Sequence, residues 1–456
     1  MMQSAPPSTA LFTDLYELTM AQAFHDEGMA GTAVFELFFR ELPPERNYIL
    51  ACGFDDALAY LENFAFATDE IDWLAGTRLF SDAFLKKLAT LRFEGDVFAV
   101  PEGTAVFAHE PVMQVVAPLP EAQLVETWLL NQIHYQSLVA TKAARVVVAA
   151  NGRPVMDFGA RRAHGSDAAN KAARAGYIGG LAGTSNVFAG RLYDIPLHGT
   201  MAHSYVQAHD DEAAALAAFV SRYPQTTVLV DTYDTMAGID TVIRLATERG
   251  SAFPVGGIRI DSGDLVELSR RAREKLDAAG LQQVRIVLSG GLDEDKVARL
   301  VREAPVDAFG VGTAMVVSAD RPSFDCAYKL VEYAGRPRLK ASTSKLLLPG
   351  RKQIFRRRDG DVFSGDTLAS QGETPAGEPL LAQVMQAGQR IEGMGRTARD
   401  CRAFCHDQIG MLPERLRRLD KAEVGYPVAV SASLRQLQKQ ELARLGLGAS
   451  ANSGSR

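Results

Sequence analysis

Between about residue 150 and residue 320, the sequence alternates between short apolar stretches, polar loops and amphipathic stretches. The stretches expected to be β-strands are 153–159, 180–186, 195–204, 226–234, 254–264, 283–291 and 306–314. Several precede helix-like segments such as SDAANKAARAGY and GDLVELSRRAREKLDAAG. About six or seven such units in a row are typical of a β/α barrel with a parallel sheet. Because the count falls short of eight, we predict an irregular, incomplete barrel.

The segments on either side lack this alternation and are predicted to mix α and β structure. Residues 339–366 read as two hairpin strands, expected to return to the N-terminal part of the chain. We therefore predict an α+β sandwich domain from residues 1–145 with about 331–395, the barrel from 146–330, and a C-terminal helical extension with a disordered tail from 396–456.

Composition excludes several classes of protein. The formal net charge of −6 gives a nucleic-acid partner no electrostatic support. Four cysteines in 456 residues do not make a disulfide framework, which favours a reducing cytosol. No run of about 18 apolar residues occurs, and MMQSAPPSTA lacks the pattern of a secretion signal. We expect a soluble cytoplasmic protein with no membrane partner.

Polar residues follow the expected strands at their carboxyl ends. They are Asp157 and Arg161, Thr184 and Ser185, Thr200 and His203, Asp231, Arg259 and Asp261, Ser289 to Gly291, and Gly312 with Thr313. Active sites of β/α barrels lie at this end of the strands. The sequence therefore predicts an active site carried by the barrel.

GIRIDSGD is the most informative of these strand ends. On a strand, Arg259 and Asp261 point to the same side. An arginine suits a phosphate or carboxylate, and an aspartate suits sugar hydroxyls. The alternative is a structural ion pair at the rim of the barrel.

Two further motifs point to anionic ligands. The glycine turns in VLSGGLDED and FGVGTAM suit phosphate binding through backbone N–H groups, although a tight turn alone also needs glycine. DFGARRAHG places Phe158 and two arginines in one loop, where a flat anionic ring would bind. The alternative is a core phenylalanine beside solvated arginines.

His203 follows the stretch GTMA, and the next expected strand ends in Asp231. A carboxylate on an adjacent strand would make the imidazole competent as an acid/base or as a transient phosphoryl acceptor. The other histidines are interpreted as structural or surface residues: His25, His109, His134, His164, His198, His209 and His406. Cys401, Cys405 and His406 have no second cysteine pair within reach, so we expect no structural zinc and no dedicated metal site.

Taken together, these motifs resemble the nicotinate phosphoribosyltransferase family over nearly the full chain. The similar stretches, in order, are TDLYELTM, FELFFRELPPERNYILACG, DFGARRAHG, AGTSNV, GTMAHS, LVDTYDT, RIDSGDL and FGVGTAM. The resemblance implies a type II phosphoribosyltransferase fold and a homodimer with shared active sites. It also implies that nicotinate and 5-phosphoribosyl 1-diphosphate give nicotinate mononucleotide and diphosphate, with ATP hydrolysis coupled through a phosphohistidine.

The resemblance also assigns roles to individual residues. His203 is implied to be the phosphorylated residue, and Asp231 its partner. Around nicotinate it implies Tyr16 (from the second subunit), Phe158, Arg161, Ser185, Thr200 and Arg259. Around 5-phosphoribosyl 1-diphosphate it implies Arg40, Arg259, Asp261, Ser289, Gly290, Gly291, Gly312 and Thr313. Mg²⁺ would neutralise the leaving diphosphate and ride mainly on substrate phosphates.

The sequence leaves other functions open. The similar nicotinamide-using enzymes carry an aspartate where GTSN has Ser185, and an aspartate would repel the nicotinate carboxylate. Quinolinate-using relatives are considerably shorter. A catalytically silent nucleotide-binding homologue would lack His203, Arg259 or Asp261, and a phosphosugar isomerase should show a Lys or Glu base at a strand end. The basic hairpin at 351–361 lies either near the diphosphate or on the surface.

Overall fold

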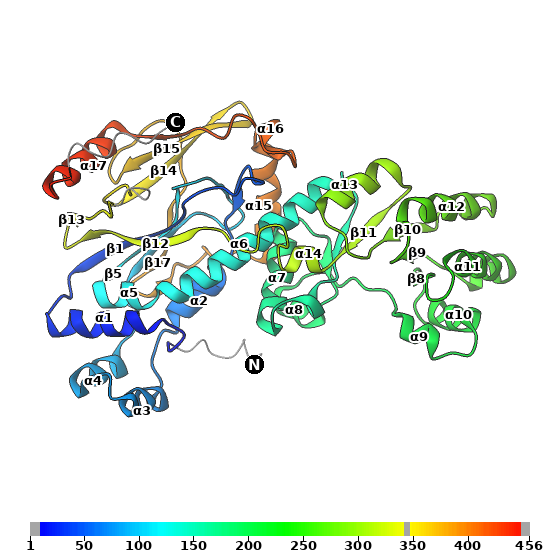
Figure 1. Ribbon diagram of the computed structural model, residues 1–456, viewed down its shortest axis with the longest axis horizontal. Coiled ribbons are helices and arrows are strands. Elements are labelled where there is room, and N and C mark those ends of the chain that lie inside the picture. The colour runs from blue at the N-terminus through cyan, green and yellow to red at the C-terminus, as the bar shows by residue number, and fades with distance from the viewer. Residues whose placement is uncertain (1–9, 342–346, 448–456) are drawn as a thin grey trace. The chain divides into compact units, whose positions relative to one another are not determined.

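The computed structural model describes residues 10–341 and 347–447, and it divides into two compact units (Figure 1). The first comprises Met1–Ser137, Ser323–Arg396 and Asp407–Arg456, and the second comprises Leu138–Pro322 and Thr397–His406. The expected C-terminal extension, 396–456, thus divides between the two units. Its expected disordered tail lies outside the described residues.

The second unit is built on a six-stranded parallel sheet with the strand order β7-β6-β11-β10-β9-β8. The strands are β6 (Val155–Asp157), β7 (Gly183–Thr184), β8 (Thr227–Leu229), β9 (Gly257–Ile260), β10 (Arg285–Leu288) and β11 (Ala308–Val311). Among these named strands β7 pairs only with β6, and β8 only with β9. The sheet is therefore curled but open, which confirms the prediction of an incomplete barrel.

Helices connect the strands of this sheet in the predicted alternation. They are α7 (Ser166–Ile178), α8 (Val187–Tyr193), α9 (His203–Gln207), α10 (Glu212–Arg222), α11 (Thr235–Arg249), α12 (Leu265–Ala278), α13 (Glu294–Glu303) and α14 (Thr313–Val316), with 3₁₀ turns at Ala160–Arg162 and Gly250–Ala252. Asp234, Asp264 and Asp293 cap α11, α12 and α13 by accepting backbone N–H groups of the first turn. Each cap begins a helix a few residues after a strand ends, and this keeps the intervening loop short.

The expected strand at 195–204 is not a strand in the structure. Only Leu197 pairs, through an isolated parallel bridge to Thr184 at the end of β7. The His198 N–H donates to the Thr184 carbonyl, and the Thr184 N–H donates to the Pro196 carbonyl. His203 is the first residue of α9 rather than the end of a strand.

The first unit combines an antiparallel sheet with two smaller sheets. The seven-stranded sheet has the order β13-β12-β1-β5-β3-β17-β18, with β13 (Arg336–Pro337), β12 (Cys326–Tyr333), β1 (Thr32–Phe39), β5 (Pro111–Pro118), β3 (Asp96–Ala99), β17 (Ala382–Gln386) and β18 (Gln389–Arg390). The smaller sheets contain β16 (Glu378–Pro379), β14 (Lys352–Asp359), β15 (Val362–Ser370) and β19 (Val428–Val430), and β2 (Ile49–Leu50) with β4 (Ala105–Val106).

Strands β14 and β15 form a hairpin within the first unit. The stretch 339–366, in which two hairpin strands were expected, includes residues 342–346, which lie outside the described residues. The basic stretch of the hairpin is only partly exposed. Arg356 is 2% exposed and pairs with the buried Asp366, whereas Arg357 and Arg358, which lie on either side of a register shift in the hairpin, are exposed.

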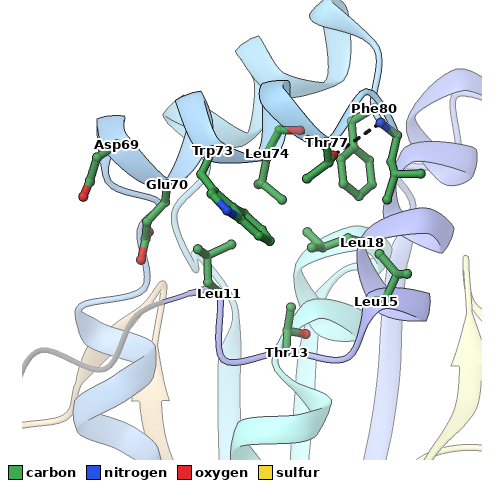
Figure 2. A pocket seen from close by; sticks show the side chains of 11 residues that line it. Leu11, Thr13, Leu15, Leu18, Asp69, Glu70, Trp73, Leu74, Thr77 and Phe80 are labelled. Carbon is green, nitrogen blue, oxygen red and sulfur yellow. Dashed lines mark hydrogen bonds between the residues drawn. The ribbon is translucent and has the colours of Figure 1, made fainter.

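Helices of the first unit surround these sheets: α1 (Leu15–Asp26), α2 (Phe54–Glu62), α3 (Thr68–Thr77), α4 (Asp82–Thr90), α5 (Leu119–Leu124), α16 (Glu414–Arg417) and α17 (Ala432–Arg444). Helices α6 (Glu126–Ala149) and α15 (Ala398–Met411) contribute residues to both units. A groove of about 740 Å³ in the first unit is lined by residues that include Leu15 and Leu18 of α1 and Trp73 and Leu74 of α3. Figure 2 shows these side chains around the groove. None of the described helices is long and apolar enough to cross a membrane.

Candidate active site

A cavity of about 560 Å³ opens in the second unit, in the part of the unit where the loops after β6 and β7 lie. Its lining includes five residues that the sequence predicted for nicotinate: Phe158, Arg161, Ser185, Thr200 and Arg259. The remaining lining residues are Ala160, Val187, Leu197, His198, Gly199, Met201 and Ala202. The cavity thus combines an aromatic ring, two guanidinium groups and hydroxyl groups on a partly apolar wall, which suits a small flat anion.

Phe158 is held as one wall of this cavity. Its backbone N–H donates to the Val311 carbonyl at 2.8 Å. A Cβ atom on Gly310 would lie 2.4 Å from the Phe158 ring, so the glycine in β11 makes room for the aromatic side chain. The Arg259 guanidinium carbon lies 5.2 Å from the centre of the ring, within the range of a cation–π contact.

Asp157 at the end of β6 fixes the two loops that carry the predicted ring-binding groups. One carboxylate oxygen accepts the Gly159 N–H, and the other accepts the Thr184 hydroxyl, both at 2.7 Å. Burial raises the pKa of Asp157, and these two hydrogen bonds oppose that rise. Asp157 therefore positions the loop to Arg161 and the loop to Ser185 without lining the cavity itself.

Arg259 connects three predicted site residues. Its Nε donates to Ser289 Oγ at 2.7 Å, its Nη1 to Thr200 Oγ1 at 3.0 Å, and its Nη2 to Asp261 Oδ1 at 2.6 Å. The alternation of side chains along a strand predicted that Arg259 and Asp261 point to the same side, and their hydrogen bond confirms this. The guanidinium is consequently fixed in orientation before any ligand arrives.

Asp261 stays ionised beside this arginine. Burial by itself would raise the pKa of Asp261, but the Ser289 hydroxyl, the Arg259 guanidinium and His203 together lower it below its ordinary value. The carboxylate side chain is 30% exposed. It can therefore still accept hydrogen bonds from the hydroxyl groups of a bound sugar.

His203 and Asp231 do not share a hydrogen bond among the described residues. His203 Nδ1 lies 3.2 Å from the Thr232 hydroxyl, one residue further along the chain. Asp231 Oδ2 accepts the Asp261 N–H at 2.9 Å and the Ser262 hydroxyl at 2.7 Å. Asp231 Oδ1 is buried and has no partner in the described part of the chain. The pairing of His203 with Asp231 therefore stays a prediction, and Oδ1 of Asp231 is the oxygen that could accept a hydrogen bond from the imidazole.

The glycine loops after β10 and β11 follow the same edge of the sheet. Gly290 and Gly291 have φ values of 98° and 60°, in the region that favours glycine. A Cβ on Gly290 would lie 1.9 Å from the Asp261 carbonyl oxygen, so the loop must pass very close to the end of β9. Gly312 precedes the short helix α14, of which Thr313 is the first residue.

Two predicted residues belong to the first unit. Tyr16 lies on α1 and is 46% exposed, and burial together with the nearby Glu126, Glu17 and Asp14 raises the pKa of its hydroxyl. Arg40 follows β1 and pairs with Asp325 at 2.6 Å. The other predicted site residues all belong to the second unit.

His198 is a cavity residue that sequence reasoning missed. It was interpreted as structural or surface, yet it lines the same cavity as Arg161 and Ser185. Its position directly before Gly199 and Thr200 was the available signal, because the latter residue was already predicted to bind.

Among the described residues, no group of three or more His, Cys, Asp or Glu side chains is placed to hold a metal ion. Cys52, Cys326, Cys401 and Cys405 form no disulfide in the described part of the chain.

Comparison with known proteins decides which family uses this arrangement. The N-terminal, family and C-terminal domain models of nicotinate phosphoribosyltransferase match residues 11–134, 154–342 and 371–438. The chain belongs to the nicotinate phosphoribosyltransferase family. It is 55% identical over 437 residues to nicotinate phosphoribosyltransferase pncB2 of Mycobacterium tuberculosis, covering 96% of this chain and 94% of the relative.

Other relatives agree with this assignment. Nicotinate phosphoribosyltransferase of Bacillus subtilis is 42% identical over 377 residues, covering 80% of this chain and 77% of the relative. The crystal structure of human nicotinic acid phosphoribosyltransferase superposes with a TM-score of 0.84 at 30% identity, covering 94% of this chain and 99% of the human one. The similarity extends over both units of the fold.

Proposed function

We propose that this protein is a nicotinate phosphoribosyltransferase, which joins nicotinate to 5-phosphoribosyl 1-diphosphate and releases nicotinate mononucleotide and diphosphate. The observation that carries the proposal is the 55% identity to the mycobacterial enzyme over 96% of this chain. The cavity supports it independently, because its cationic and hydroxyl groups suit a flat carboxylic acid. The absence of disulfides among the described cysteines and the family membership favour action in the cytoplasm.

The proposed step is a displacement at the anomeric carbon of the sugar. The pyridine nitrogen of nicotinate donates its electron pair to this carbon, and the electron pair of the breaking C–O bond leaves with diphosphate. Positive charge builds on the sugar as the bond breaks, so the enzyme must position the reactants and stabilise charge. Asp261, which is ionised and partly exposed, is the group suited to the ribose hydroxyls and to that positive charge.

The roles of the other residues follow from their chemistry and from the family. Nicotinate would stack on Phe158 and present its carboxylate to Arg161, Ser185 and Thr200. Arg259 would face the sugar and the base with its orientation already fixed. The 5′-phosphate would bind at backbone and hydroxyl groups of Ser289, Gly290, Gly291, Gly312 and Thr313. Arg40 would contact the diphosphate.

Mg²⁺ would arrive on the diphosphate and neutralise its charge as the leaving group departs. The ionised carboxylate of Asp261 is an oxygen donor of the type that this ion prefers.

His203 is proposed to couple ATP hydrolysis to the transfer. Its Nδ1 faces Thr232, so Nε2 is the nitrogen available to attack the γ-phosphorus and release ADP. Water would then cleave the P–N bond and release phosphate. The buried, unpaired Oδ1 of Asp231 is an acceptor that could hold the imidazole during this cycle.

A homodimer with shared active sites is part of the proposal, and Tyr16 would reach the nicotinate ring from the second subunit. The supporting feature is the apolar surface around α1. Leu15 is 57% exposed, Phe12 43% and Tyr16 46%, and Trp73 across the groove in Figure 2 is 64% exposed. A patch of this kind is typical of a protein–protein interface.

The test is a product assay with the full chain, 5-phosphoribosyl 1-diphosphate, Mg²⁺ and either nicotinate or nicotinamide, with and without ATP. We expect mononucleotide from nicotinate, with a rate that ATP increases in the wild type and not in His203→Ala. His209→Ala is the matched control, because the His209 ring already bonds the Tyr205 carbonyl in the same unit. Product from neither base would mean a silent homologue, and equal use of nicotinamide would contradict the interpretation of Ser185.

A further inference from the structure

The lining of the cavity divides into groups that already have partners and groups that do not. All three donor nitrogens of Arg259 are engaged with Ser289, Thr200 and Asp261. In contrast, the side chains of Arg161, Ser185 and His198 make no hydrogen bond or ion pair to any described residue. Donors that converge on a cavity without partners are the ones available to a ligand.

His198 is held at the cavity by its backbone rather than by its ring. Its N–H donates to the Thr184 carbonyl at 2.9 Å, directly before Ser185. The ring lies against β7, where its Cδ2 would be 2.5 Å from a Cβ on Gly183. The glycine therefore provides the space that the imidazole occupies, and the ring nitrogens have no partner among the described residues.

We propose that His198 is a specificity-determining residue that donates a hydrogen bond to the carboxylate of the bound pyridine base, alongside Arg161 and Ser185. This inference rests on the proposed function and names a ligand-recognising residue beyond those assigned to it. A carboxylate offers two oxygens and about four acceptor positions, enough for an arginine, a hydroxyl and an imidazole N–H. Nicotinamide would instead direct its NH₂ group at one of these donors, which leaves both without an acceptor.

The experiment compares wild type with His198→Ala and His198→Gln, in which the amide keeps one donor. We expect the KM for nicotinate to rise about tenfold in His198→Ala, as for the loss of one hydrogen bond to a charged group. The kcat and the KM for 5-phosphoribosyl 1-diphosphate should change by less than about twofold, and the KM for nicotinamide should not rise. His198→Gln should recover part of the nicotinate affinity.

Calorimetric titration of nicotinate into each protein gives a readout without turnover, and its Kd should follow the same order. His209→Ala again serves as the control histidine, with an unchanged KM for nicotinate. An unchanged KM and Kd for nicotinate in His198→Ala would overturn the inference. An equal rise for nicotinate, nicotinamide and the sugar substrate would also overturn it, since that pattern means general distortion. If wild type makes no mononucleotide from nicotinate, the proposed function itself fails.

Discussion

Each unit contains an arginine–aspartate ion pair, Arg356 with Asp366 in the first and Arg259 with Asp261 in the second, but the two pairs differ in their exposure to solvent. Both arginines approach an aspartate oxygen at 2.6 Å, Asp366 and Asp261 respectively. The side chains of the first pair are 2% and 0% exposed, and those of the second are 13% and 30% exposed. One pair is closed to solvent, whereas the other lies at a cavity.

The surroundings complete this contrast. Asp366 also accepts the Tyr426 hydroxyl, and the rings of Phe107 and Phe363 lie within cation–π range of Arg356. Next to Arg259, the donors of Arg161 and Ser185 have no partner among the described residues. Protein groups enclose the buried pair completely, whereas the site around Arg259 keeps side-chain donors that are available to a substrate.

The largest effect should come from breaking the buried pair. Arg356→Met leaves the Asp366 carboxylate in the interior without its cation, and we expect the free energy of unfolding to fall by about 3–5 kcal/mol. Urea denaturation measures this loss. Arg358→Met is the control on the same strand, because its partially exposed pair with Glu378 should be worth less than about 1 kcal/mol. Equal losses of unfolding free energy in Arg356→Met and Arg358→Met would contradict the special importance of the buried pair.

The same substitution in the second unit should affect catalysis more than stability. Arg259→Met removes a fixed cation beside the reacting groups, and we expect kcat/KM for nicotinate to fall about 10²–10³-fold. The free energy of unfolding should fall by only about 1 kcal/mol, since Asp261 is partly solvated and keeps its Ser289 hydrogen bond. Steady-state kinetics and urea denaturation are measured on one preparation. A stability loss as large as that of Arg356→Met would contradict the comparison.

A smaller effect on catalysis is expected from substitution of Ser185. Ser185→Asp places a negative charge on the cavity wall, so kcat/KM for nicotinate should fall about 10–100-fold while that for nicotinamide holds or rises. Ser185→Ala, which only removes a donor, should cause a smaller loss. The interpretation of Ser185 fails if the two substitutions change both bases alike.

The smallest effect is expected from Glu110→Gln, on the free energy of unfolding. Burial, and then the adjacent Asp366, hold the pKa of Glu110 well above its ordinary value, which favours the neutral carboxyl in the folded protein. Glu110→Gln replaces one neutral group by another that can still accept the Phe107 N–H. We expect the free energy of unfolding to change by less than about 1 kcal/mol. A loss approaching that of Arg356→Met would show that Glu110 is ionised.

The sequence predicted the parts of the site that depend on strand periodicity. Arg259 and Asp261 were expected on one side of a strand, and they are in contact. Phe158, Arg161, Ser185 and the two glycine loops follow strand ends as predicted. These predictions succeed because a strand fixes the direction of every second side chain.

Loops and cores were less predictable. His203 was placed at a strand end, yet it begins α9 and its ring meets Thr232 rather than Asp231. His198 lies in a loop, where no periodicity indicates a direction. In the run of three arginines at 356–358, the sequence gives no sign that Arg356 alone is buried, because a register shift between Arg357 and Arg358 interrupts the alternation of side chains along the strand.

The most direct test of the account is the preference for nicotinate over nicotinamide, measured as the ratio of their kcat/KM values in wild type and in Arg161→Ala. The unpaired guanidinium should recognise the carboxylate. We therefore predict a wild-type ratio of about 100 or more that falls at least about tenfold in Arg161→Ala. Arg299→Ala, at an exposed pair with Glu303, should leave the ratio unchanged. A wild-type ratio near one, or the same ratio in Arg161→Ala, would contradict the account.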